Sequence, residues 1–81
     1  MAKYRRKPII FECEQFHPEK VPWPSGVEQK GSLNTEREWS IVTLEGRHIV
    51  TPGDWIVTGV KGEKWPVKPD VFEATYEKVD E

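Results

Sequence analysis

The stretch that decides the fold is Thr51-Pro-Gly-Asp-Trp-Ile-Val-Thr-Gly-Val-Lys-Gly-Glu-Lys-Trp-Pro-Val-Lys-Pro-Asp70, in which short apolar runs are separated by Gly and Pro. Pro52-Gly53 has the composition of a type II turn, because proline fixes φ at the first central position and glycine accepts a positive φ at the second. Residues 54–58 then predict a strand, with Trp55 and Val57 on the face opposite Ile56.

The second half of the same stretch predicts a return strand and a helix. Residues 59–62, Gly-Val-Lys-Gly, form a turn, and residues 63–68 return as a strand that Pro66 restricts to a sheet edge or a bulge. Pro69 suits the first turn of a helix, so one short helix is expected near 69–74. Residues 75–79 are expected to end the chain as a further strand.

Upstream of this stretch, alternating residues predict more β structure. Residues 8–16 alternate with the period of a half-buried strand, and Pro8 is tolerated at its start. Residues 39–44 and 47–51 flank Glu45-Gly46, which predicts a tight hairpin turn. We therefore expect a mainly β fold (β-rich α+β). The strands are expected to form a small antiparallel, strongly bent sheet or a partly open barrel. The short helix near 69–74 accompanies them.

Residues 17–37 interrupt this pattern and are expected to form an irregular Pro/Gly-rich loop. Five Pro and Gly residues in this interval exclude a long helix. Trp23, between two prolines, either folds the loop onto the body of the protein or presents a rigid aromatic face to a ligand. Loops of this length in compact domains are typically functional or mobile.

The size and charge of the chain limit what it can be. Its 81 residues form a single domain, residues 1–81, and such a small core leaves little stability, so a homo-oligomer is expected. A net charge of −2 argues against general nucleic-acid binding. No run of about 20 apolar residues predicts a membrane span, and we expect a cytoplasmic protein. Cys13, the only cysteine, is interpreted as a small packing residue.

The candidate ligand site combines lysines with aromatic side chains. Lys61, Lys64 and Lys68 bracket Trp65, whose ring could stack on a base while the ammonium groups neutralise a phosphate. Arg5 and Arg6 could add bidentate contacts. The full set of proposed binding residues is Arg5, Arg6, Trp23, Asp54, Lys61, Glu63, Lys64, Trp65 and Lys68. The competing interpretation is that Trp65 packs across the sheet and that the lysines are only solvated.

Catalytic and metal sites are not predicted. Asp54, Glu63 and Asp70 could pair as carboxylates, but no nucleophile motif, P-loop or dinucleotide fingerprint accompanies them. His17 and His48 with a single cysteine match no zinc spacing. We therefore expect no enzyme activity, no cofactor and no metal.

Both ends of the chain resemble a family of small phage and prophage proteins. The start Lys3-Tyr-Arg-Arg-Lys-Pro-Ile-Ile-Phe-Glu-Cys-Glu-Gln-Phe16 is similar to that family's KYRKKPVVIEAxQW. Residues 52–77 resemble its PGDWIxxGVKGExYPxKPDxFExTYE signature. This chain has Trp65 where relatives have Tyr and Val67 where many have Cys, so it lacks any thiol chemistry of those relatives.

The resemblance implies a phage or prophage accessory protein in the cytosol of the host cell. The first hypothesis is that it sequesters a small anionic, nucleotide-derived signal of host defence. The alternative is a protein-protein interaction module that binds or inhibits a host or phage protein through an aromatic-rich hairpin. A third hypothesis is a small hydrolase acting on such a ligand.

Overall fold

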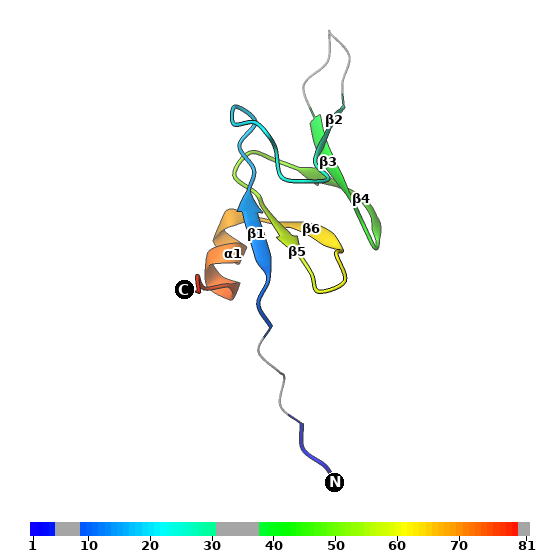
Figure 1. The fold of residues 1–81 in the computed structure, drawn as a ribbon, viewed down its shortest axis with the longest axis vertical. Coiled ribbons are helices and arrows are strands. Elements are labelled where there is room, and N and C mark those ends of the chain that lie inside the picture. Colours follow the sequence, from blue (N-terminus) through cyan, green and yellow to red (C-terminus); the bar gives the residue numbers. More distant parts are fainter. Residues whose placement is uncertain (5–8, 31–37, 80–81) are drawn as a thin grey trace.

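The protein consists of two small antiparallel sheets and one short helix (Figure 1). The computed structural model describes residues 1–4, 9–30 and 38–79. We name the sheet with strand order β1-β5-β6 sheet A and the sheet with order β2-β3-β4 sheet B. The elements are β1 (Glu12–Gln15), β2 (Glu28–Lys30), β3 (Glu38–Thr43), β4 (Gly46–Val50), β5 (Trp55–Thr58), β6 (Lys64–Val67) and α1 (Pro69–Thr75).

The chain passes from sheet B to sheet A at the turn Thr51–Asp54. The Asp54 amide donates to the Thr51 carbonyl at 3.0 Å, and Gly53 has φ 91°, as the predicted type II turn requires. The Phe16 amide donates to the Asp54 carbonyl at 2.7 Å, and the Gly53 amide donates to the Phe16 carbonyl at 2.8 Å. These bonds extend the pairing of β1 with β5, so β5 leaves β4 and joins a new sheet.

The main core lies between the two sheets and is centred on Phe16. The fully buried members of this cluster are Phe16, Ile41, Val50 and Ile56, and Trp23, Val27 and Trp39 pack against them. The rings of Trp23 and Trp39 meet Phe16 edge-on, with centroids 5.8 and 5.4 Å away. Full burial of an apolar side chain, such as that of Phe16 or Ile41, contributes about 1.5–3 kcal/mol.

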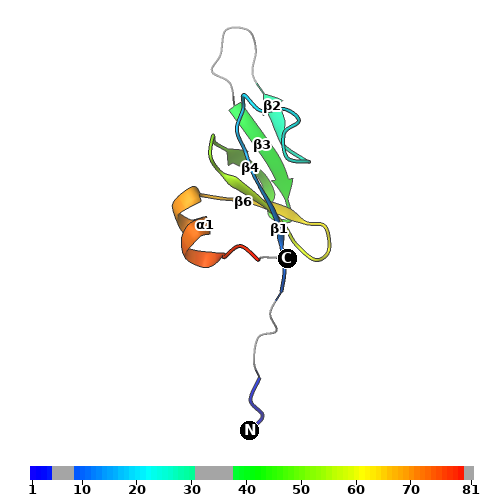
Figure 2. The ribbon, with the colours of Figure 1, turned by 60° about the vertical axis from the view of Figure 1, so that its left-hand side comes forward.

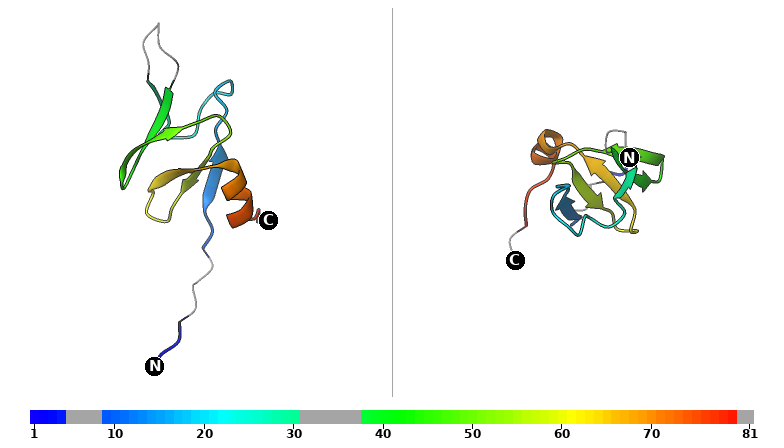
Figure 3. Two further views of the ribbon diagram at one scale, coloured as in Figure 1. Left: turned by 180° about the vertical axis from the view of Figure 1, so that it is seen from behind. Right: turned by 90° about the horizontal axis from the view of Figure 1, so that it is seen from above.

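The helix α1 lies beside sheet A (Figures 2 and 3). A second cluster, of aromatic side chains, lies between them. Trp55 stacks on Phe72 of the helix, with centroids 4.2 Å apart. Phe11 meets Trp65 and Tyr76 edge-on. Sheet A is therefore covered on both faces, by sheet B and by α1.

The structure confirms the expected fold class and corrects its architecture. The chain is mainly β, all strand pairs are antiparallel, and the predicted helix near 69–74 spans Pro69–Thr75. The described strands form two sheets instead of one bent sheet, and they close no barrel. The physical reason is the turn at Thr51–Asp54, whose backbone bonds to Phe16 rather than continuing the ladder of β4.

Two boundaries predicted for the β regions differ from those in the structure. The first strand is Glu12–Gln15 rather than 8–16, and Pro8 lies outside the described residues. The hairpin turn is Leu44-Glu45 rather than Glu45-Gly46, because Gly46 already pairs with Thr43. Pro66 occupies the predicted position, since β6 is an edge strand of sheet A.

Two further expectations change in the irregular regions. The interval 17–37 contains the short strand β2, Glu28–Lys30, which pairs with β3; residues 31–37 lie outside the described part of the chain. Residues 76–79 form no strand. Tyr76 has an extended backbone, but its ring stacks on Phe72 and meets Phe11 edge-on, and the segment has no paired neighbour among the described strands.

Candidate functional site

Lys64 lies between two open hollows along the seam where the sheets meet. Its ammonium donates to the Thr58 hydroxyl at 2.8 Å. The hollows have volumes of about 340 and 350 Å³, at the lower end of the range for small-molecule sites. The acidic residues that line them are Glu28 and Glu63 in one and Glu12 and Glu14 in the other. Each hollow therefore carries two glutamates as well as Lys64, which disfavours an anionic ligand.

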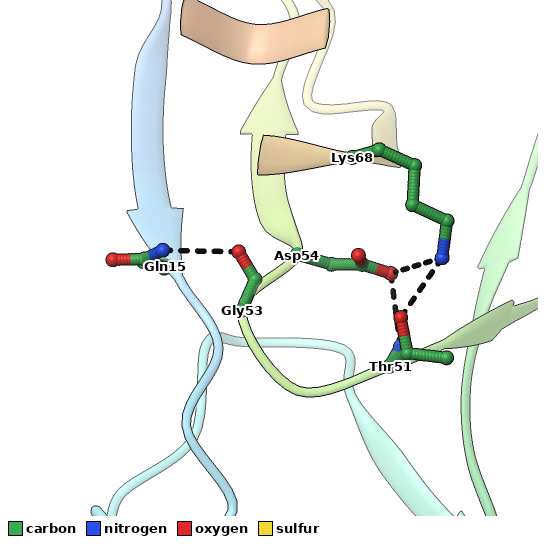
Figure 4. Close-up of polar contacts among 5 residues, drawn as sticks. All are labelled: Gln15, Thr51, Gly53, Asp54 and Lys68. Atoms are coloured by element: carbon green, nitrogen blue, oxygen red, sulfur yellow. Dashed lines mark hydrogen bonds and ion pairs between the residues drawn. The ribbon is translucent and has the colours of Figure 1, made fainter. Parts of the chain in front are cut away.

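Among the described members of the predicted set, Asp54 and Lys68 form an ion pair (Figure 4). The Asp54 carboxylate is 1% exposed, and its Oδ2 accepts from the Thr51 amide at 2.9 Å and from the Lys68 ammonium at 3.3 Å. The same ammonium donates to the Thr51 hydroxyl at 2.8 Å. Gln15 donates to the Gly53 carbonyl at 3.0 Å from the β1 side.

This arrangement stabilises the turn and the helix start. Asp54 occupies the end of the turn between the sheets, and Lys68 is the residue before α1. A buried carboxylate is tolerated only when paired and hydrogen-bonded, which explains why both lysine and backbone amide converge on Oδ2. Asp54 Oδ1 and Trp39 Nε1 are buried with no hydrogen-bond partner among the described residues.

Trp65 and Trp23 both pack against other side chains of the protein. Strand alternation places Trp65 on the face of β6 opposite Lys64, where its ring meets Phe11 edge-on with centroids 6.0 Å apart. The Trp23 indole donates to the Pro18 carbonyl at 3.1 Å and its ring packs on Phe16. Both side chains are half-buried, which agrees with the packing interpretation of each.

The remaining predicted residues lie elsewhere. Lys61 is exposed on the turn between β5 and β6. Glu63 covers Gly59 so closely that a side chain at position 59 would collide with its carboxylate. Arg5 and Arg6 lie outside the described residues. The structure thus brings Asp54 and Lys68 together and does not gather Lys61, Lys64 and Lys68 around Trp65.

Cys13 fits a packing role better than a nucleophilic one. Burial raises the pKa of its thiol above the ordinary value, because the thiolate loses solvation. The thiol therefore stays protonated at neutral pH, whereas reactive cysteines have a lowered pKa. Within the described residues, no three His, Cys, Asp or Glu side chains gather as a metal site.

The most distinctive surface is one that the sequence reasoning missed. Three large apolar side chains of the β3–β4 hairpin, which we call the hairpin patch, are exposed: Val42 at 57%, Leu44 at 86% and Ile49 at 60%. Alternation places Val42 and Ile49 on the face of sheet B away from the core, because Ile41 and Val50 face inward. Beside them Arg47 donates to Ser40 and pairs with Glu28 at 3.1 Å.

The sequence held a signal for this patch. Ile41 and Val42 are consecutive apolar residues in one strand, so one of them must leave the core face. Leu44 stands at a hairpin turn, where polar residues are usual. Neither feature reveals where the exposed side chains gather, since that depends on the pairing of β3 with β4.

The comparisons with known proteins are negative. No family model matches the chain, and no significant match is found among curated proteins or solved structures. The resemblance to phage proteins remains a prediction that rests on the two terminal signatures. The only helix of the described residues, α1, has seven residues, and no described helix is long and apolar enough to cross a membrane.

Proposed function

We propose that this protein is a protein-protein interaction module that binds its partner through the hairpin patch. The observation that supports this most directly is the exposure of Val42, Leu44 and Ile49 on a single hairpin. In such a small protein these side chains would be expected in the core, which holds few fully buried apolar residues. An exposed apolar cluster with a polar border is typical of a surface that binds another protein.

The local chemistry suits a protein partner with an apolar surface. Arg47 of β4 and Glu28 of β2 form an ion pair beside the patch. Their opposite charges cancel, so this pair adds no net charge there. The Arg47 guanidinium also donates to the Ser40 hydroxyl, so the charge that Arg47 and Glu28 place beside Val42 and Ile49 is paired. The other exposed large apolar residues lie on separate segments: Met1, Tyr4, Ile9, Ile10, Val21, Val60, Val71 and Val79.

The sequestration hypothesis stays a prediction with weaker support. Its lysines lie in separate places, Lys68 is paired with Asp54, and Lys64 is flanked by glutamates. A nucleotide phosphate near Lys64 would meet carboxylates as well as the ammonium. The hydrolase hypothesis likewise stays a prediction, and no observation favours it over binding.

In biological terms, we propose an accessory protein of phage or prophage origin that acts by occupying a surface of a host or phage protein. This role requires no reaction, only a complementary surface and a rigid scaffold. The scaffold is present because sheet B is joined to sheet A by the shared core around Phe16. The partner is identified by the chemistry of its surface, which should be apolar with polar borders.

Affinity capture with matched variants tests this proposal. Leu44→Asp places a charge at the turn end of the hairpin patch without touching the core, since Leu44 is the most exposed of the three patch residues. Val60→Asp makes the same change on the exposed turn between β5 and β6. We expect wild type and Val60→Asp to capture the same protein and Leu44→Asp to lose it.

Two results would contradict the proposal. One is equal capture of the partner by Leu44→Asp. The other is a discrete small-molecule adduct in native mass spectrometry, released intact by heat, in the absence of any captured protein; this would favour sequestration. Circular dichroism of each variant shows whether the fold is retained.

A further inference from the structure

β4 is the open edge of the molecule. It pairs with β3 on one side, and no described strand pairs with its other side. Figure 1 shows β4 at the margin of the molecule. Four of its five residues are exposed, and the strand contains no proline. An exposed edge of this kind is a template for pairing with another strand.

The other edges are less suited to pairing. β6 carries Pro66, which lacks an N–H donor. β1 carries the exposed acidic residues Glu12 and Glu14, a common protection of sheet edges. β2 has only three residues. Among the described strands, β4 is therefore the longest edge without protection.

The register identifies which backbone groups of β4 are free. Thr43 and Gly46 close the two-residue turn as a hydrogen-bonded pair, and bonded and non-bonded pairs alternate along an antiparallel ladder. Gly46, His48 and Val50 therefore direct their N–H and C=O groups to β3. Arg47 and Ile49 direct theirs away from it, which leaves two donors and two acceptors on the outer edge.

We propose that the occupant of this edge is β4 of a second copy, paired antiparallel about a two-fold axis at His48. This register places Arg47 opposite Ile49 of the second copy, and the reverse. All four free groups of each edge are then used, in four hydrogen bonds between the chains. A register centred on Arg47 or Ile49 leaves half of these groups unpaired.

The side chains agree with this register. Arg47 lies opposite an isoleucine instead of a second arginine, so no like charges of this residue are directly opposed. Its charge is already paired with Glu28 of its own chain. When two copies pair, the β4 edges of both copies are satisfied by one contact. A strand from another protein satisfies the β4 edge of one copy only.

The dimer has a consequence for the hairpin patch. Pairing of the two β4 strands joins two copies of sheet B into one six-stranded sheet. Val42 and Ile49 of both copies then lie on the same outer face, and the apolar surface doubles. The dimerisation proposal depends only on the unpaired backbone groups of β4. It is therefore independent of the proposal that the hairpin patch binds another protein.

The test measures mass in solution and amide exchange together. Ile49→Pro removes an N–H that points away from β3, so no hydrogen bond of the β3–β4 ladder is lost, while the contact between chains loses two symmetry-related bonds. The matched control Ile49→Val keeps the N–H and most of the side chain. By analytical ultracentrifugation we expect dimers for wild type and Ile49→Val and a monomer for Ile49→Pro.

Hydrogen exchange locates the contact. The Arg47 and Ile49 amides should be protected in the wild-type dimer, and the Arg47 amide should exchange rapidly in the Ile49→Pro monomer. A monomeric wild type overturns the proposal, as does a dimer in which both amides exchange rapidly. Protection of these amides only after another protein is added would assign the edge to that protein instead. Leu44→Asp should remain dimeric, which separates this test from that of the partner.

Discussion

At the scale of single residues, Asp54 shows how one side chain connects the two sheets to the helix. Its backbone carbonyl binds Phe16, its amide closes the turn from sheet B, and its carboxylate binds Lys68 at the start of α1. The sequence predicted Asp54 and Lys68 as ligand contacts. In the structure the two residues pair with each other, and Lys68 supplies the counter-charge of the buried Asp54 carboxylate.

Substitution of Lys68 by methionine should therefore destabilise the protein. The change leaves the buried Asp54 carboxylate without its counter-charge. The expected loss is about 1–2 kcal/mol, at the low end for such pairs because the lysine side chain is more than half exposed. Urea unfolding measures the change, and Lys61→Met, on an exposed turn, should alter stability by less than ~0.5 kcal/mol.

A double substitution shows whether the pair is responsible. In an Asp54→Asn background the further change Lys68→Met should have little effect, because the buried charge is already absent. An undiminished effect in that background would mean that Lys68 acts through another contact.

At the scale of elements, α1 depends on its contact with sheet A. It has seven residues, no side-chain cap and no fully buried residue, and a helix of this length is unstable alone in water. Phe72 stacks on Trp55 and Tyr76 and holds the helix in place. The sequence predicted the helix start from Pro69, but the stack that stabilises the helix comes from the tertiary structure.

Phe72→Ala should detach the helix. The loss of the stacked ring is expected to cost about 2 kcal/mol, less than a fully buried phenylalanine because the ring is half-buried. Circular dichroism should show reduced helicity, and Trp55 fluorescence should shift to the red. Val71→Ala, a neighbouring exposed position, should leave both signals unchanged; similar losses in the two variants would argue against the stack.

At the scale of the whole molecule, the proposed dimer explains the open edge of β4, because pairing with a second copy satisfies the backbone groups of that edge. Such a dimer would link folding to association, since part of the stability then comes from the contact between chains.

The melting temperature should consequently depend on protein concentration. Tenfold dilution of the wild type is expected to lower Tm by about 3–5 °C, because dilution favours dissociated and unfolded chains. The Tm of Ile49→Pro should not change on dilution. Scanning calorimetry over a series of concentrations makes the measurement, and an invariant wild-type Tm would be the contrary result.

Local sequence was sufficient for those features that depend on few neighbouring residues. The Pro52-Gly53 turn, the edge position of β6 and the start of α1 follow from the backbone limits of Pro and Gly. The mainly β class follows from the alternation of apolar residues. These limits act within a few bonds, so they hold whatever the rest of the chain does.

Tertiary structure alone decided the division into two sheets, the packing partners of the tryptophans and the location of the exposed surface. Alternation shows that Lys64 and Trp65 lie on opposite faces of a strand, but not which face meets sheet B and which meets α1. Likewise, the exposed position of Val42 and Ile49 and the free edge of β4 depend on which strand pairs with β3. Those choices are made by contacts between segments far apart in the chain, chiefly the bonds of Phe16 to the turn at Asp54, and no local pattern contains them.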